Sequence, residues 1–204
     1  MDNILISVVI VVRDQAELIE QNLPLFLGAA EETQAEVIVV EDTSTDEVHD
    51  MLQLMRSNAP RLYTTFLPRT IVMGQSHQQM ALSIGVKAAK GNYIVMADIQ
   101  RPPCSSEWLK GLADGEAAVV FCKPKKQEVT HLVASDPEDL KAMILKAERK
   151  SGQGHNGRRL KMRRGLYDAV AVKKLYAFDT IRLFDQRIGL WRLAWLRLCV
   201  WLRF

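Results

Sequence analysis

Short, almost continuously apolar stretches alternate in the first part of the chain with longer stretches in which apolar residues recur every three or four positions. The clearest apolar stretch is ILISVVIVV at residues 4–12, which is rich in β-branched residues. Stretches of this kind are typical of parallel strands that are buried on both faces. Residues 14–30 follow with apolar positions near helical spacing, and we expect Asp14 to cap the N-terminus of this helix.

The alternation continues to Lys123 and predicts an α/β fold. The further predicted elements are, in order, a strand at 35–40, a helix at 45–59, a strand at 61–67, a helix at 75–91, a strand at 92–98, a short helix at 102–115 and a strand at 117–123. Strands and helices in this order build a mostly parallel sheet with helices on both faces. Sheets of this type bind ligands at the carboxyl ends of their strands.

The alternation ends near residue 126, and the rest of the chain has a different character. It contains a predicted helix, a glycine-rich basic loop, a strand and a final helix rich in tryptophan and arginine, at residues 135–150, 151–165, 166–174 and 183–204. We therefore expect three parts, which are residues 1–126, residues 127–182 and the C-terminal helix at 183–204.

Positive charge is concentrated toward the end of the chain. Residues 151–204 hold 12 Lys and Arg against 3 Asp and Glu, whereas the first 150 residues hold 15 against 21. An acidic body with a basic end favours an anionic partner, such as a phosphate group, a lipid head group or a nucleic acid. Few aromatic residues stand around the Arg and Lys cluster, which argues against nucleic acid.

The cysteines and the first residues favour a cytoplasmic protein. Cys104, Cys122 and Cys199 are widely spaced and form no disulfide or metal-ligand pattern, which indicates a reducing compartment. The four histidines are scattered and indicate no metal site. The N-terminal residues have no basic region, and their apolar stretch is too short to span a bilayer, so we expect no secretion signal.

Acidic residues directly follow two of the predicted strands. Glu41 and Asp42 stand at the end of the strand in VIVVEDTSTDE. Asp98 ends the strand in YIVMADIQRPP, and Gln100 follows two residues later. The carboxyl ends of parallel strands meet at one edge of a sheet, so these side chains are expected to converge on one crevice. This arrangement is typical of a nucleotide or sugar-nucleotide site.

These motifs resemble the first half of the family 2 glycosyltransferases, which have the GT-A fold. In that family a first strand of the type S-V-V-I-P-x-Y-N precedes V-V-D-D-G-S-T-D, then N-x-G-x-x-x-A-x-G-x-Y-I and a D-x-D at a strand end. This chain has SVVIVVRD, VIVVEDTSTD, IGVKAAKGNYI and ADIQ in the same order and at similar spacing, over residues 4–110. The resemblance implies a GT-A-like sheet followed by a basic helical C-terminal segment, and a transferase that uses a nucleotide-diphosphate sugar.

The resemblance also implies roles for five residues. Asp42 stands where the family's second aspartate binds the base, and Glu41 stands beside it in place of the first. Asp98 falls on the first aspartate of D-x-D, near the ribose and the sugar phosphate, and Gln100 on the second, which binds a divalent metal in the family. Arg13 replaces the tyrosine that flanks the base, and its guanidinium can also stack on a ring.

The degenerate D-x-D motif affects the expected metal binding. The amide of Gln100 is a poor substitute for a carboxylate on a hard cation, so we expect no metal site and weak or absent dependence on Mn²⁺ or Mg²⁺. Other cations would then have to neutralise the diphosphate or a lipid phosphate. The candidates are the basic residues of the glycine-rich loop, which are Arg158, Arg159, Lys161, Arg163 and Arg164.

In the family, a carboxylate from an E-D pair in the second half deprotonates the acceptor hydroxyl. No clear E-D pair stands at the expected place in this chain. Asp185 in LFDQRIGLW is near that place, and Asp168 in GLYDAVAV is the second candidate. For each of them, an ordinary surface or capping carboxylate is the alternative.

Two functions are consistent with these features. The first is a glycosyltransferase that moves a sugar from a nucleotide-diphosphate donor to a saccharide or lipid-linked acceptor, in the synthesis of a cell-surface polysaccharide. The second is a catalytically silent GT-A module that binds a nucleotide sugar or a protein partner. The missing metal ligand favours the second function, and the retained Asp42 and Asp98 oppose it. In either case residues 1–126 would hold the nucleotide sugar and residues 127–182 would form the acceptor side.

The C-terminal helix suggests where the protein is located. Residues 188–204 are too short and too often interrupted by arginine to span a membrane. They place Trp191, Trp195 and Trp201 beside arginines, a combination that is typical of the lipid head-group boundary. We therefore expect peripheral contact with the inner face of the cytoplasmic membrane. Packing of these tryptophans against the domain or a second subunit is the alternative.

Overall fold

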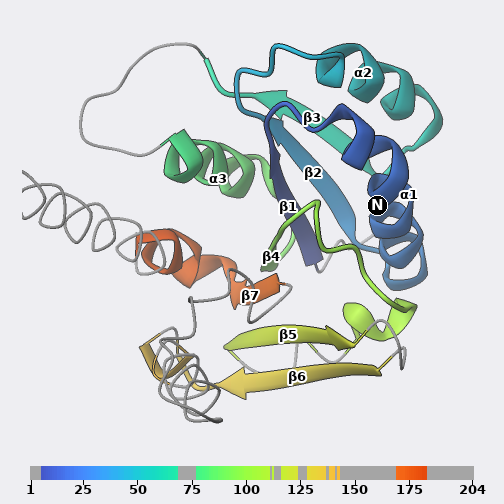
Figure 1. Ribbon diagram of the computed structural model, residues 1–204. Helices are drawn as coiled ribbons and strands as arrows, with labels where there is room; N and C mark the ends of the chain where they lie inside the picture. The colour runs from blue at the N-terminus through green and yellow to red at the C-terminus, as the bar shows by residue number, and fades with distance from the viewer. Residues whose placement is uncertain are drawn as a thin grey trace, which may run out of the picture.

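The computed structural model of the chain describes residues 6–68, 77–110, 112, 116–123, 128–136, 138–140, 142 and 169–182. Within these residues lies one seven-stranded sheet with helices on both faces (Figure 1). Its strands are β1 (Ile6–Val12), β2 (Glu36–Glu41), β3 (Leu62–Phe66), β4 (Tyr93–Ala97), β5 (Ala117–Lys123), β6 (Glu128–Ala134) and β7 (Ala169–Lys173). The labelled helices are α1 (Ala16–Thr33), α2 (Val48–Asn58) and α3 (His77–Ala88), with the 3₁₀ turns η1 (Ser106–Trp108) and η4 (Lys174–Tyr176). Residues 138–140, 142 and 177–182 are helical as well.

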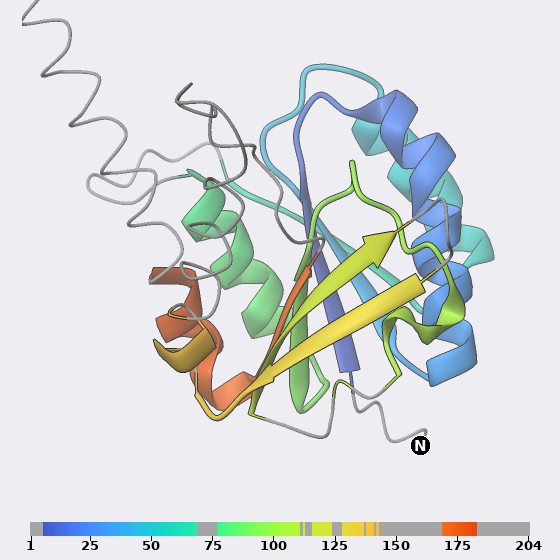
Figure 2. The same ribbon diagram turned by 60° about the horizontal axis from the view of Figure 1, so that its bottom comes forward.

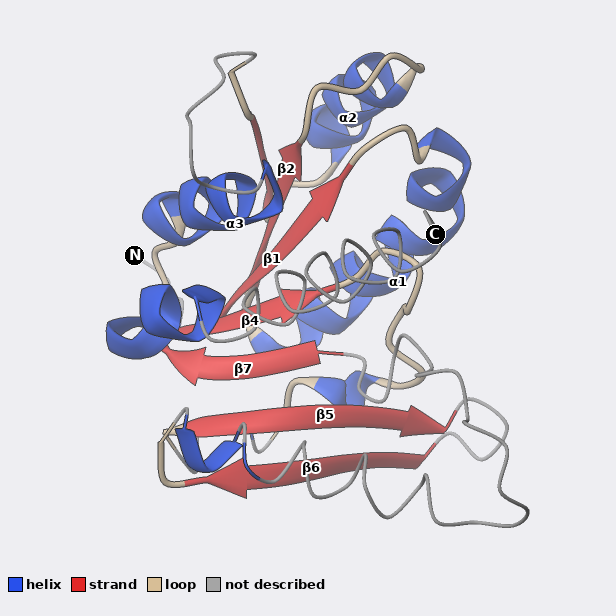
Figure 3. Ribbon diagram, turned by 60° about the vertical axis from the view of Figure 1, so that its left-hand side comes forward, coloured by secondary structure: helices blue, strands red, loops and turns tan. Residues whose placement is uncertain are grey.

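The strands lie in the order β3-β2-β1-β4-β7-β5-β6. The first four are parallel, with Val9 of β1 opposite Ile38 of β2 and Met96 of β4. Figure 3 shows β7 between β4 and β5, and β7 is antiparallel to both of them. As a result, β5 points in the same direction as the first four strands. The predicted α/β fold with a mostly parallel sheet is therefore confirmed.

Both faces of the central strands are buried, which explains their almost continuously apolar sequences. α1 and α2 cover one face, and α3 covers the other (Figures 1 and 2). Val8 and Ile10 of β1 belong to the same buried cluster as Phe26 of α1, whereas Val9 belongs to the cluster that contains Ala81 of α3. Since successive residues of a strand point to opposite faces, neighbouring residues at a strand end face different helices.

α3 lies directly against the sheet at Gly85. A Cβ atom at this residue would come 2.3 Å from Val9 Cγ1 and 3.1 Å from Val40 Cγ2. Glycine therefore allows the helix to approach β1 and β2 more closely than any other residue would. This close packing fixes the position of α3 over the two central strands.

A buried carboxylate, that of Glu36, links three segments at the amino end of the sheet. Glu36 is 6% exposed, and its Oε1 accepts hydrogen bonds from Ser7 Oγ (2.6 Å) and from Lys90 N (2.6 Å). Ser7 Oγ in turn accepts a hydrogen bond from Gly91 N at 2.8 Å. The network connects β1, β2 and the turn between α3 and β4, at the opposite end of the strands from the predicted site.

The structure differs from the prediction at the strand β6 and at the predicted helix of residues 102–115. β6, which the sequence pattern did not predict, pairs with β5 at the edge of the sheet. Within the predicted helix at 102–115, the described residues contain the short 3₁₀ turn η1. β1 to β5 precede residue 126, β6 and β7 follow it, and all seven strands belong to one sheet. The division of the chain into two parts at residue 126 stays a prediction.

The predicted basic loop at 151–165 and the predicted C-terminal helix at 183–204 lie outside the described residues. The expectations for these two segments therefore stay predictions. Among the helices that the structure does describe, none combines the length and the hydropathy of a membrane span.

Candidate functional site

The carboxyl ends of β1, β2, β3 and β4 lie at one edge of the sheet, and the loops after β1 and β2 are bonded to each other there. Asp14 N donates to Ser44 Oγ (3.2 Å). Asp14 Oδ1 accepts hydrogen bonds from the backbone N–H (2.7 Å) and the hydroxyl (3.0 Å) of Thr45. Ala16 N donates to Asp46 Oδ2 (3.0 Å). The two loops therefore form one cross-linked frame.

The prediction that Asp14 caps the first helix is wrong. Gln15 precedes α1 and makes no side-chain cap, while the N–H of Ala16 is bonded to Asp46 instead. The other carboxylate oxygen of Asp46 accepts a hydrogen bond from Val48 N (3.3 Å) at the start of α2. The carboxylate of Asp46 therefore accepts hydrogen bonds from the first turns of both α1 and α2, where negative charge is favourable.

The bonds from Thr45 also hold the pKa of Asp14 below its ordinary value of 3.8. The backbone N–H of Thr45 is the largest cause, and its hydroxyl is the second. Because the folded-state pKa is lowered, the contribution of Asp14 to stability is present above the ordinary pKa and is lost as the pH falls through the lower, folded value. The hydrogen bonds to the carboxylate of Asp14 should accordingly weaken in acid, as the pH falls below 3.8.

Thr43 stands in a strained backbone conformation at the end of β2. Its φ is 50°, in the left-handed region that β-branched residues rarely adopt. The family motif V-V-D-D-G-S-T-D, which this segment resembles, has glycine at the same position. Strained residues of this kind concentrate at functional sites, so Thr43 supports the assignment of a site to this edge.

We expect Thr43→Gly to raise the free energy of unfolding by about 1 kcal/mol, because glycine adopts a positive φ without a steric penalty. Urea unfolding followed by circular dichroism would measure the change. Thr43→Ala is the control, since alanine removes the β-branch but keeps a Cβ, and it should recover only part of the gain. A clear loss of stability in Thr43→Gly would contradict the strained conformation.

Glu41 and Asp42 point to opposite faces of the sheet. Glu41 Oε2 lies 3.0 Å from His49 Nδ1 in the first turn of α2, and His49 Nε2 lies 2.8 Å from Gln53 Nε2. Asp42 Oδ1 lies 3.1 Å from Nδ1 of His77, the first residue of α3. Each carboxylate therefore has an imidazole partner on its own face of the sheet, and neither contact was predicted from the sequence.

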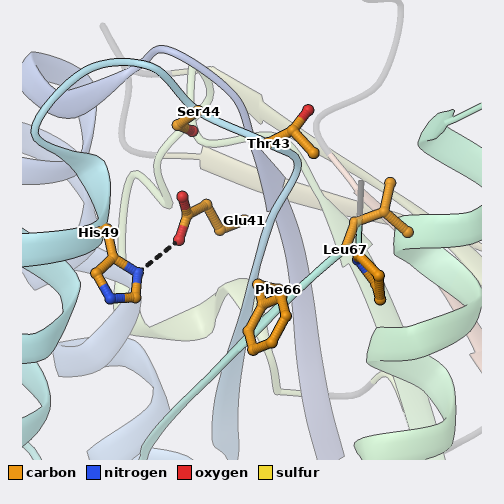
Figure 4. A pocket seen from close by; sticks show the side chains of 7 residues that line it. Glu41, Thr43, Ser44, His49, Phe66 and Leu67 are labelled. Atoms are coloured by element: carbon orange, nitrogen blue, oxygen red, sulfur yellow. Dashed lines mark hydrogen bonds and ion pairs between the residues drawn. The ribbon is translucent and has the colours of Figure 1, made fainter. Parts of the chain in front are cut away.

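A cavity of about 300 Å³ lies on the Glu41 side of this edge (Figure 4). Its lining consists of Glu41, Thr43, Ser44, His49, Phe66, Leu67 and Pro68. The hydrogen-bonded side chains of Glu41 and His49 form one wall, and the ring of Phe66, which is 62% exposed, lies opposite (Figure 4). Small-molecule pockets begin at about this volume, so a ligand the size of one ring can enter it.

Asp98 and Gln100 lie in the turn that follows β4, beside β1 in the sheet. Both side chains are exposed, and Asp98 Oδ1 accepts a hydrogen bond from Gln100 N (3.0 Å). Arg101 N donates to the carbonyl oxygen of Asp98 (2.9 Å). The turn is anchored to α1 by Asn22, whose Nδ2 donates to the carbonyl oxygen of Ile99 (2.9 Å). The carboxylate of Asp98 is therefore presented on a fixed turn.

The five residues predicted to bind a nucleotide sugar all stand where β1, β2 and β4 end; they are Arg13, Glu41, Asp42, Asp98 and Gln100. Arg13 is exposed, and its Nε lies 3.8 Å from Asp14 Oδ2. Their proposed roles stay predictions. The catalytic candidates Asp168 and Asp185 and the basic loop residues Arg158, Arg159, Lys161, Arg163 and Arg164 lie outside the described residues.

The described residues do not fit a divalent metal at the D-x-D position. Hard cations prefer charged carboxylate oxygens, whereas this turn offers one carboxylate, that of Asp98, and the neutral amide of Gln100. In the part of the chain that the structure describes, no three His, Cys, Asp or Glu side chains are grouped so that they could hold a metal ion. No step of the reaction is therefore assigned to a metal.

The chain is similar to known proteins in its three-dimensional structure. No family model matches the chain, and no curated protein is similar to it in sequence. The mannosyltransferase PcManGT from Pyrobaculum calidifontis, in complex with GDP-Man and Mn²⁺, is 22% identical; the match covers 90% of this chain and 46% of that one, with a TM-score of 0.50. TarS from S. aureus, in complex with UDP-GlcNAc, is 20% identical over 59% of this chain and 35% of that one, with a TM-score of 0.48.

Glucosyl-3-phosphoglycerate synthase from Mycobacterium tuberculosis, in complex with phosphoglyceric acid, is 17% identical over 84% of this chain and 57% of that one, with a TM-score of 0.49. The chain spans less than two thirds of the length of each of these three proteins. At such identities the similarity establishes the fold alone. The resemblance to family 2 glycosyltransferases is therefore confirmed at that level, and the chain has the GT-A fold.

Proposed function

We propose that the chain is a glycosyltransferase that binds a nucleotide-diphosphate sugar at the carboxyl edge of β1, β2 and β4. The observation that carries the proposal is Asp42, a carboxylate that is 6% exposed at the end of β2. A buried carboxylate needs hydrogen-bond donors, and an N–H group of a nucleotide base is a suitable one. PcManGT, which has the same fold and was solved with GDP-Man and Mn²⁺, supports a nucleotide sugar as the ligand.

The residues of the edge would divide the binding of the donor between them. Asp42 would accept a hydrogen bond from the base, Arg13 would stack on the base, and Asp98 would stand near the ribose and the sugar phosphate. The diphosphate develops negative charge as it leaves, and positive side chains would stabilise it. We assign this role to the basic loop residues Arg158, Arg159, Lys161, Arg163 and Arg164.

The acceptor hydroxyl needs a general base as it attacks the sugar. Asp185 is the first candidate and Asp168 the second. The carboxylate would take the hydroxyl proton while the new glycosidic bond forms and the bond from the sugar to the diphosphate breaks. We propose a saccharide or a lipid-linked acceptor in the synthesis of a cell-surface polysaccharide, with residues 188–204 at the inner face of the cytoplasmic membrane.

A catalytically silent GT-A module is the second candidate function. The substitution at Gln100 favours it, because a neutral amide stands where the family motif has a metal-binding carboxylate. Such a module would bind the nucleotide sugar, or a protein partner, without transferring the sugar. Measuring nucleotide binding and sugar release in parallel separates the two functions.

We expect Asp42→Ala to weaken UDP or GDP binding by about 1.5–3 kcal/mol, because a charge-assisted hydrogen bond to the base is lost. Asp98→Ala should also weaken binding, through the ribose and the phosphate. Isothermal titration calorimetry with each nucleotide, with and without Mn²⁺, measures both effects. Glu20→Ala is the matched control, since it removes an exposed carboxylate from α1 and should leave the affinity unchanged.

Unchanged affinity in both Asp42→Ala and Asp98→Ala would show that the nucleotide site is assigned to the wrong edge. Sugar transfer that disappears with a chelator and returns with Mn²⁺ would contradict the expected metal independence. Nucleotide binding without any sugar transfer or hydrolysis would support the silent module instead of the enzyme.

A further inference from the structure

Among the residues that the structure describes, hydrogen-bond donors contact one of the two carboxylate oxygens of Asp42. Oδ1 accepts hydrogen bonds from His77 Nδ1 (3.1 Å) and, at a longer distance of 3.4 Å, from Thr43 Oγ1. Oδ2 has no hydrogen-bond partner among the described residues. The fully buried side-chain atoms without a partner in these residues are Ser105 Oγ and Trp108 Nε1, and Asp42 Oδ2 is not among them. Within the described part of the chain, Oδ2 is therefore the oxygen at which a ligand can bind.

His77 acts on Asp42 as a hydrogen-bond donor. An ionised carboxylate has no proton to donate, so Nδ1 of the imidazole carries the hydrogen. The imidazole side chain is 44% exposed and the side chain of Asp42 only 8%, so the contact lies at the boundary between the protein and the solvent. The contact has a fixed geometry because His77 begins α3, and Gly85 holds this helix directly against β1 and β2.

Nucleotide bases differ in the number of N–H groups that they present side by side. Uracil has one ring N–H, which lies between two carbonyl groups. Guanine has a ring N–H and, directly beside it, an amino group. A carboxylate with both oxygens open would pair with both donors of guanine in a bidentate contact. With both acceptor sites of Oδ1 already used by His77 and Thr43, the carboxylate is matched to a single N–H.

We propose that His77 is a positioning residue that makes the site selective for a uridine nucleotide over a guanosine nucleotide. The inference rests on the proposed function, because it places the base at Asp42. His77 acts by occupying Oδ1 and fixing the orientation of the carboxylate. The amino group of guanine would meet an oxygen that already accepts two hydrogen bonds and would find no acceptor there, so the wild-type chain should bind UDP about tenfold more tightly than GDP.

Three substitutions of His77 test this role by calorimetry, with UDP and GDP as the probes. His77→Ala removes the donor and should bring the ratio of the two affinities close to one. His77→Asn places an amide nitrogen at the position of Nδ1 and should preserve the ratio. His77→Gln carries its nitrogen one bond further and should not. If the substitutions merely disturbed α3, they would weaken the binding of UDP and GDP equally. His77→Asn and His77→Gln would then give the same ratio of affinities.

His131→Ala is the matched control, because it also removes an imidazole that is hydrogen-bonded at 3.1 Å, to the carbonyl oxygen of Trp108, but from β6. Its affinity ratio should equal that of the wild type. An unchanged ratio in His77→Ala, or tighter binding of GDP than of UDP by the wild type, would overturn the inference and leave the proposed function standing. Failure of both nucleotides to bind the wild type would overturn the proposed function and the inference with it.

Discussion

Replacing Gly91 with alanine should lower the free energy of unfolding by about 3 kcal/mol, because no space exists for a side chain at this turn. A Cβ atom would come 2.7 Å from Ser7 Oγ, 2.8 Å from the carbonyl carbon of Ile6 and 2.8 Å from Ser7 N. Two of these atoms belong to the backbone of β1, so relief requires the strand or the turn to move. Movement of the turn would also stretch the hydrogen bond from Gly91 N to Ser7 Oγ.

Gly28→Ala is the matched control for this substitution. Gly28 lies on an exposed position of α1, and a Cβ there would meet no atom within 4 Å. Alanine is the better helix former, so this variant should be more stable than the wild type by about 0.5–1 kcal/mol. Urea unfolding of both variants gives the comparison. Equal stability of Gly91→Ala and the wild type would mean that the turn does not lie against β1 as described.

The fold was predictable where burial alone determines the sequence. β1 is covered on both faces, so nearly every position had to be apolar, and residues 4–12 show this directly. β2 and β4 are buried in the same way over most of their length. The carboxyl ends of parallel strands lie at the same edge of a sheet. The sequence alone therefore predicts that Asp42 and Asp98 stand at one edge.

Strand order in the second half was not predictable in the same way. The sequence predicts a strand at residues 166–174, where β7 lies, but nothing in its alternation specifies that it pairs with β4 on one side and β5 on the other. Periodicity reports which faces of a strand are buried and gives no information about its neighbours. β6 escaped prediction because an edge strand is only partly buried, and polar residues such as Thr130 and His131 interrupt its apolar pattern.

The details of the site depend on contacts between distant parts of the chain. Asp14 appeared to be a helix cap because local rules consider only the next few residues, whereas its partner Thr45 is 31 positions away. The pairing of His77 with Asp42 spans 35 positions and likewise has no local signature. The strain at Thr43 was detectable only as a departure from the glycine of the family motif, and its φ gives that departure a physical meaning.

Substitution of Glu36 by alanine should lower the free energy of unfolding by about 2–4 kcal/mol, because one buried and one partly buried donor would lose their acceptor. Ser7 Oγ and Lys90 N both donate to Oε1 of Glu36, each at 2.6 Å. Ser7 also receives the hydrogen bond from Gly91, so the loss would extend to the turn before β4. Chemical denaturation measures the change, and unfolding should remain a single transition.

Glu36→Gln separates the shape of the acceptor from its charge. Glutamine keeps an oxygen at the position of Oε1 and can accept the same two hydrogen bonds, so it should recover most of the stability lost in Glu36→Ala. Glu31→Ala is the surface control, since it removes an exposed carboxylate from α1 and should change stability by no more than about 0.5 kcal/mol. If Glu36→Ala were as stable as Glu31→Ala, the network at the amino end of the sheet would contribute nothing, and the close approach of Gly91 to β1 would have to be maintained by packing alone.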